Sequence, residues 1–144
     1  MAILEIIREP NELLLRQSEP VVQFDARLSQ LLDNMRDTMA KARGLGLAAV
    51  QVGQLLRVCI VSTRDGIVEF INPEIIKSSK PKAGEEGCLS VPGESFHVRR
   101  AQTVTISAQD KHGKWFELEL TGMDAVCIQH EIDHMNGILV GGLK

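Results

Sequence analysis

The first strong pattern of apolar and polar positions runs from residue 25 to residue 44. Apolar side chains recur there at intervals of three and four residues, the period of one face of an α-helix; they are Leu28, Leu31, Leu32, Met35 and Met39. Asp25 is a suitable N-cap and Gly44 a suitable C-terminal stop. We therefore predict an amphipathic helix over this range, with its apolar stripe in the core.

Two pairs of strands follow, each with the composition typical of a hairpin. Residues 56–62 and 67–72 are rich in β-branched side chains and are separated by a segment that contains Asp65-Gly66, a sequence typical of tight turns. Residues 103–109 and 115–120 form the second pair, in which apolar and polar positions alternate. Three smaller features are expected: a helical turn at 12–15, a short strand at 74–77 and a polar loop at 78–82.

The last helical segment carries histidines and a carboxylate at a spacing typical of hydrolytic metal sites. In His130-Glu131-Ile132-Asp133-His134 the two imidazoles stand four residues apart, roughly 6 Å along a helix axis and on one face. One metal ion can therefore bind both histidines, with Glu131 beside it as a general base. A solvated surface helix is the simpler alternative, but the apolar residues 125–128 indicate that this helix is buried.

Composition and charge narrow the possible classes of protein. The 144 residues suffice for one domain, taken as 1–144, and the aromatic content of 3% predicts a core of Leu, Ile and Val. A formal net charge of −3 gives no basic footprint for nucleic acid. Without a secretory signal or an apolar run of about 18 residues, we expect a soluble cytoplasmic protein and no membrane contact. Three cysteines without C-x-x-C spacing argue against a disulfide framework.

A metal site of this kind needs a third protein ligand. Cys127 stands on the same helix, but at about 1.5 Å per residue it lies about 10 Å from His134, too far for a thiolate to reach an ion held between the histidines. Cys59 falls within a predicted strand, whereas Cys88 falls in a segment bracketed by glycine and proline and is better placed to reach outward. We therefore assign Cys88 as the third ligand. The ligand types alone leave zinc and iron open.

Three motifs, complete and in order, resemble those of the peptide deformylases. They are G-x-G-x-A-A-x-Q at 44–51, E-G-C-x-S at 86–90 and H-E-x-D-H at 130–134, and the resemblance covers nearly the whole chain. It implies an α+β fold, with mainly antiparallel strands around a central helix that carries the H-E-x-D-H motif. It also implies a metal-dependent hydrolase that removes the N-formyl group from the N-terminal methionine of newly made polypeptides and releases formate.

The resemblance also implies roles for the residues at the matching positions. One divalent metal ion would be bound by three ligands: Cys88, His130 and His134. The family usually uses iron(II) and accepts nickel, cobalt or zinc. Glu131 would transfer protons, while the side-chain amide of Gln51 and the backbone N–H of Leu89 would stabilise the oxyanion. Asp133 is expected to be structural rather than catalytic.

The same resemblance places a pocket for the methionine side chain of the substrate. Its apolar lining would come from four positions near the motifs: Leu45, Met123, Val126 and Cys127. Gly46 would also bind the substrate. Gly84 and Ser95 stand where larger side chains are often found. We therefore expect a preference for methionine or another unbranched apolar side chain, with looser discrimination than is usual in the family.

Two other classes of function remain open. One is an ordinary zinc peptidase that cuts internal peptide bonds, whose signature requires neither a cysteine ligand nor Gln51. The other is a non-enzymatic binding module in which the metal only stabilises the fold, which leaves Glu131 and Gln51 without a role. Only ten residues follow His134, where many family members continue into a further helix. We therefore expect a monomer of the bacterial or phage-host cytoplasm that docks weakly, or not at all, on ribosomes through its C-terminus.

Overall fold

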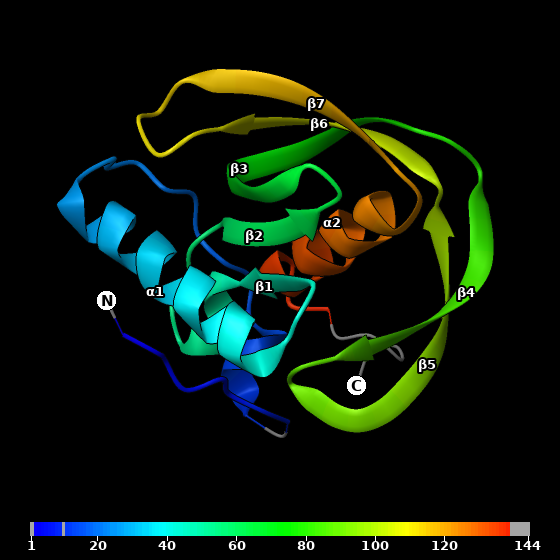
Figure 1. Ribbon diagram of the computed structural model, residues 1–144, viewed down its shortest axis with the longest axis horizontal. Helices are drawn as coiled ribbons and strands as arrows, with labels where there is room; N and C mark the ends of the chain where they lie inside the picture. The colour runs from blue at the N-terminus through cyan, green and yellow to red at the C-terminus, as the bar shows by residue number, and fades with distance from the viewer. Residues whose placement is uncertain (1, 10, 139–144) are drawn as a thin grey trace.

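The computed structural model describes residues 2–9 and 11–138. In chain order its elements are η1 (Glu12–Leu15), α1 (Ala26–Ala42), β1 (Gly46–Ala48), η2 (Ala49–Val52), β2 (Val58–Thr63), β3 (Gly66–Ser78), β4 (Pro81–Cys88), β5 (Val91–Ala101), β6 (Thr103–Gln109), β7 (Trp115–Thr121) and α2 (Gly122–Met135). Figure 1 shows α2 inside the arc formed by the strands, with α1 on the outside against β1 and β2. The predicted α+β class is confirmed. Within the described ranges, no helix is both long enough and apolar enough to cross a membrane.

Two separate sheets surround α2. Five antiparallel strands form the larger sheet in the order β1-β2-β3-β6-β7, and β4 pairs only with β5. The β2–β3 hairpin closes at the pair Thr63↔Gly66, and the β6–β7 hairpin closes at Gln109↔Trp115. Both predicted hairpins are therefore confirmed. The β4–β5 hairpin curves round the other side of α2 as a separate arm (Figure 1).

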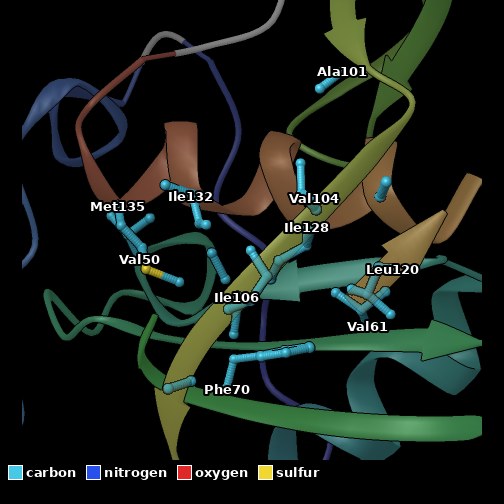
Figure 2. Close-up of a cluster of buried hydrophobic side chains, with 14 residues drawn as sticks. Val50, Val61, Phe70, Ala101, Val104, Ile106, Leu120, Ile128, Ile132 and Met135 are labelled. Carbon is cyan, nitrogen blue, oxygen red and sulfur yellow. The ribbon is translucent and has the colours of Figure 1, made fainter. Parts of the chain in front are cut away.

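The main core lies between α2 and the larger sheet. Figure 2 shows Ile128, Ile132 and Met135 of α2 directed towards side chains from the strands, among them Phe70 and Ile106. Ile128, Met135, Phe70 and Ile106 are all 0% exposed. Burying a side chain of this size contributes about 1.5–3 kcal/mol, so this contact fixes the position and rotation of α2. The predicted burial of the apolar run at 125–128 is thereby explained.

The first helix forms as its pattern predicts and covers the other face of β1 and β2. The carboxylate of Asp25 accepts hydrogen bonds from the backbone N–H groups of Arg27 and Leu28 at 3.1 and 3.2 Å, which satisfies two of the free donors of the first turn. Four members of the apolar stripe are buried and Leu31 is only partly buried; the four are Leu28, Leu32, Met35 and Met39.

The prediction that Gly44 stops this helix was wrong by one residue. Arg43 takes the left-handed conformation, with φ 56°, and its N–H binds the carbonyl oxygens of Met39 and Ala40. Gly44 follows in the cap, where its N–H donates to the carbonyl oxygen of Met39 at 3.0 Å. A Cβ at position 44 would lie 2.7 Å from Cδ1 of Leu89, so a larger residue there would displace the end of that side chain.

The predictions for residues 67–82 were wrong in two respects. Residues 67–72 and 74–77 are not separate strands but parts of β3, which continues through an irregularity where Asn72 takes a positive φ of 52°. The predicted loop at 78–82 is also wrong, because β4 begins at Pro81. Most of β4 is exposed on both faces, so it lacks the alternation of apolar and polar residues that reveals a strand. The C-terminal glycines, on which the expectation of weak ribosome docking rests, lie outside the described residues.

Candidate metal centre and active site

Helix α2 presents three functional side chains to one buried region. His130 is 8% exposed, Glu131 is 4% exposed and His134 is fully buried. The spacing of four residues brings the two imidazoles together as predicted, with their Nε2 atoms 3.2 Å apart. At this distance the two nitrogen atoms can share one bound cation or one proton.

Cys88 reaches the same point from the β4–β5 hairpin. It is the last residue of β4, and its Sγ lies 3.4 Å from Nε2 of His134. The candidate ligand atoms of Cys88, His130 and His134 all lie within 4.8 Å of one another. The ligand atoms of one tetrahedral zinc ion lie roughly 3.4–3.6 Å apart, and the 3.2 Å and 3.4 Å separations that involve His134 are close to this range. Three protein ligands would leave a fourth position for solvent or substrate.

The orientation of His130 is set by the carboxylate of Glu86, a residue that was not predicted to have a role. Nδ1 of His130 lies 2.8 Å from Oε1 of Glu86, which places the proton on Nδ1 and leaves Nε2 free for a metal. Arg100 holds Glu86 through two hydrogen bonds, of 2.9 and 3.1 Å, and also binds the carboxylate of Asp133. The guanidinium therefore joins the hairpin to α2. The predicted structural role of Asp133 agrees with this ion pair.

Burial acts on all the ionisable groups here, with different results. For both histidines, burial disfavours the charged imidazolium and so lowers the pKa. At His130, hydrogen bonds to Cys88 and Glu86 outweigh the effect of burial, and its pKa is raised. Burial and the charge of His130 lower the pKa of His134. The pKa of Glu86 is lowered because its hydrogen bonds to His130 and Arg100 outweigh burial. The Glu86 carboxylate is thus held in its charged form beside His130.

Glu131 is placed as a general base requires. Burial raises the pKa of its carboxyl group to about 7, with opposing contributions from His130 and Glu86. Its Oε1 atom is buried and has no hydrogen-bond partner within the described residues. A buried carboxylate with a free oxygen and a pKa near neutrality can accept a proton and return it.

Gln51 and Leu89 flank the cysteine. Gln51 is 2% exposed; its Oε1 accepts a hydrogen bond from the backbone N–H of Ala48 at 2.9 Å, and its Nε2 lies 4.0 Å from Sγ of Cys88. Leu89 follows Cys88 at the turn between β4 and β5 and lines the same pocket. Both groups predicted to stabilise an oxyanion therefore lie at the candidate metal centre.

A pocket of about 490 Å³ opens beside these residues. The five positions predicted to contact the substrate all line it: Leu45, Gly46, Met123, Val126 and Cys127. Leu45 and Met123 are 53% and 61% exposed, so they form the rim, whereas Val126 and Cys127 are partly buried. Burial raises the pKa of Cys127 to about 12, so this thiol is neutral. Cys127 does not belong to the metal-binding group found among the described residues.

Other sequence expectations have mixed outcomes. Gly84 and Ser95 are not among the residues that line the pocket, to which β4 and β5 contribute Glu85 to Cys88, Pro92 and Gly93. The looser discrimination expected from these two small residues stays a prediction. The two remaining histidines, His97 and His112, are exposed and lie outside the candidate metal-binding group found among the described residues. Glu86 and Arg100 were not predicted as functional residues; Glu86 stands in the E-G-C-x-S motif, but no sequence signal singled out Arg100.

Comparisons with known proteins agree with this arrangement. A model of the family described as polypeptide deformylase matches residues 3–141. The peptide deformylase of Chromobacterium violaceum is 48% identical over 142 residues, which cover 96% of this chain and 85% of the relative. The chain belongs to the polypeptide deformylase family. The family and the activity predicted from the motifs, removal of the N-formyl group from nascent peptides, are thereby confirmed.

Solved structures of the polypeptide deformylase family share the fold. A peptide deformylase from Legionella pneumophila superimposes with a TM-score of 0.92 at 46% identity, and the match covers 96% of this chain and 83% of that one. A class I type b peptide deformylase from Acinetobacter baumannii gives a TM-score of 0.93 at 37% identity, and the match covers 97% of this chain and 98% of that one. The family is metal-dependent, and Cys88, His130 and His134 form a group among the described residues that could hold an ion.

Proposed function

We propose that this chain hydrolyses the formamide bond of N-formyl-methionyl peptides at a single divalent metal ion bound by Cys88, His130 and His134. The observation that carries the proposal is the convergence of these three ligand atoms within 4.8 Å, next to the buried carboxylate of Glu131. Three protein ligands leave one position open, as catalytic sites require and structural sites do not.

The protein groups around the ion have complementary tasks. The metal would act as a Lewis acid that makes a water molecule more acidic and polarises the formyl oxygen. Glu131 accepts the proton of the attacking water and then delivers it to the leaving amine, for which a pKa of about 7 is well matched. Glu86 keeps His130 oriented with Nε2 towards the ion.

The negative charge that develops on the formyl oxygen needs hydrogen-bond donors. Nε2 of Gln51 and the backbone N–H of Leu89 lie on the Cys88 side of the site and would supply two. Such donors stabilise the transition state more than the substrate, so they raise kcat rather than tighten ground-state binding. Gln51→Ala should therefore lower kcat by about 10²-fold or more.

The pocket supports a preference for methionine. Its walls are mainly apolar and include Val126 and Cys127, and its rim carries the exposed apolar side chains of Leu45 and Met123. An unbranched thioether can adapt to such a surface. Formyl-Met peptides should be cleaved faster than formyl-Asp or formyl-Lys peptides of the same length. The opposite ranking would contradict this pocket assignment.

We infer that the ion is iron(II) in the cell, with zinc, nickel or cobalt able to replace it in purified protein. One thiolate and two imidazoles suit these ions better than they suit magnesium or calcium, which prefer oxygen ligands. The preference for iron comes from the family resemblance. Metal analysis of protein purified without oxygen, from cells grown without added metal, tests it; a stoichiometric zinc content with no iron would contradict it.

One assay separates this proposal from the two alternatives. The chain is incubated with formyl-Met-Ala-Ser and with an unformylated peptide that contains internal bonds, and formate and new amines are measured separately. We expect metal-dependent formate release and no internal cleavage. Internal cleavage would favour an ordinary peptidase. Metal binding with neither product would favour a binding module.

We further infer that the chain acts as a cytoplasmic monomer and binds ribosomes weakly. A formal net charge of −3 supports weak binding, because contacts with ribosomal RNA depend on basic side chains. Light scattering tests the monomer, and cosedimentation with ribosomes at low and moderate salt tests the docking. Tight binding that persists at moderate salt would contradict the inference.

A further inference from the structure

Ser90 is buried behind the metal centre and hydrogen-bonds in two directions. The residue is 0% exposed. Its Oγ lies 2.7 Å from the carbonyl oxygen of Ile7 and 3.2 Å from Nε2 of Gln51. A carbonyl oxygen can only accept, so the hydroxyl hydrogen of Ser90 goes to Ile7. The lone pairs of Oγ are then left to accept from Gln51.

This arrangement determines which end of the Gln51 amide faces the site. Oε1 of Gln51 accepts from the backbone N–H of Ala48 at 2.9 Å, and one N–H of Nε2 donates to Ser90. If the amide were flipped, its NH₂ group would face the N–H donor of Ala48 and its oxygen would face the acceptor lone pairs of Ser90 Oγ. Neither hydrogen bond could then form. The second N–H of Nε2 is directed to the side of Cys88, where it makes a long hydrogen bond of 4.0 Å to Sγ.

The N-terminal segment holds both partners. The backbone N–H of Glu9 donates to the carbonyl oxygen of Ser90 at 3.0 Å, and the backbone N–H of Ile7 donates to the carbonyl oxygen of Gln51 at 2.7 Å. Ile7 therefore binds Ser90 through its carbonyl and Gln51 through its amide. This segment connects the end of the β4–β5 hairpin to η2.

We propose that Ser90 is a positioning residue that aims the Gln51 amide at the developing oxyanion, with the carbonyl of Ile7 fixing the direction of the Ser90 hydroxyl. The inference rests on the role proposed above for Gln51. Without the hydroxyl, Nε2 loses a buried acceptor and the amide can rotate away from its productive orientation. The loss falls on the transition state, where the second N–H of Gln51 would turn from Sγ of Cys88 to the oxyanion.

Ser90→Ala tests the proposal, with Ser18→Ala as the matched control. Ser18 is also buried, at 6% exposure, but its Oγ has no hydrogen-bond partner within the described residues. With formyl-Met-Ala-Ser, Ser90→Ala should lower kcat by about 5- to 50-fold at nearly unchanged KM and full metal content, and Ser18→Ala should change kcat less than about twofold. In the zinc-loaded protein, the ¹⁵N side-chain resonance of Gln51 should move in Ser90→Ala and stay in place in Ser18→Ala.

A double-mutant cycle separates failure of this inference from failure of the proposed function. In a Gln51→Ala background, Ser90→Ala should cause little further loss of kcat, because the group it positions is gone. If Gln51→Ala lowers kcat but Ser90→Ala does not, only the role of Ser90 is overturned. If Gln51→Ala has no effect, both roles are overturned. Equal losses from Ser90→Ala with and without Gln51 also overturn the positioning role.

A second pair of variants covers the case in which Ser90→Ala does not fold. Ser90→Thr keeps the hydroxyl, whereas Ser90→Cys keeps nearly the same volume and replaces the oxygen with a weak sulfur acceptor. We expect Ser90→Thr to retain at least about fivefold more kcat than Ser90→Cys. Equal kcat values for the two would overturn the proposal, because the hydroxyl oxygen would then be dispensable.

Discussion

Gly46 faces the carboxylate of Glu131 so closely that a Cβ at position 46 would lie 2.5 Å from Oε2 of Glu131. β1 and α2 therefore approach each other at the general base, and the missing side chain leaves the space that the carboxylate occupies. Oε1 of the same carboxylate has no partner within the described residues. Steric contact with Gly46 is thus one of the constraints that place this group.

Gly46→Ala should lower turnover by about tenfold or more while the metal content is kept. The added methyl group displaces the Glu131 carboxylate, and a small displacement of a catalytic group has a large effect on rate. The three atoms nearest to such a Cβ all belong to Glu131 and not to a proposed ligand. Gly84→Ala is the matched control, because a Cβ at position 84 meets nothing within 4 Å. Normal turnover in Gly46→Ala would show that the carboxylate has room to adjust.

Cys88→Ala should lose tight metal binding, whereas Cys127→Ala should keep it. Cys88 Sγ lies 3.4 Å from Nε2 of His134, while the Cys127 thiol is neutral and belongs to the pocket wall. Metal content after dialysis against a weak chelator measures the difference. An empty site in Cys127→Ala together with a full one in Cys88→Ala would reverse the ligand assignment.

Glu131→Gln should bind its metal normally and lose about 10²-fold or more of its turnover. The amide fits the same buried space but cannot take up a proton and pass it to the leaving amine. Single-turnover formate release by protein of known metal content measures the chemical step directly. A metal-replete variant with nearly normal turnover would exclude Glu131 from proton transfer.

Residues whose chemistry depends on local spacing were predictable from the sequence. The histidines of α2 meet because residues four apart on a helix share a face, and Cys127 could be rejected on the same helical geometry. Glu86 and Arg100 could not be assigned, because their partners lie on another element, 44 positions away for Glu86 and His130 and 33 for Arg100 and Asp133. Such contacts depend on how a hairpin docks onto a helix.

Strands that bury one face were also predictable from the sequence, whereas a strand exposed on both faces was not. β6 and β7 bury one face against the core, so alternation revealed both of them. β4 is largely exposed on both faces, so its composition resembles a loop, although its last residues build the metal centre. The E-G-C-x-S motif therefore predicted the chemistry of this segment, but the sequence did not predict that the segment forms a strand.

Arg100→Met should lower the free energy of unfolding by about 3 kcal/mol. The Arg100 side chain is 12% exposed and neutralises Glu86, whose side chain is 8% exposed. Its removal leaves that buried carboxylate with only His130 as a partner among the described residues. Arg36→Met is the matched control, since the Arg36–Glu69 pair lies nearer the surface, with the arginine 39% exposed, and such pairs contribute at most about 1 kcal/mol.

Urea unfolding of the two variants in excess chelator makes this comparison, because the metal would otherwise add its own binding energy to the folded state. With the metal restored, Arg100→Met should also release it faster than Arg36→Met, since Glu86 no longer holds His130 firmly. Equal stability losses in the two variants would show that the hairpin is held to α2 by other contacts, such as that of Gln129 with the backbone of Ala101.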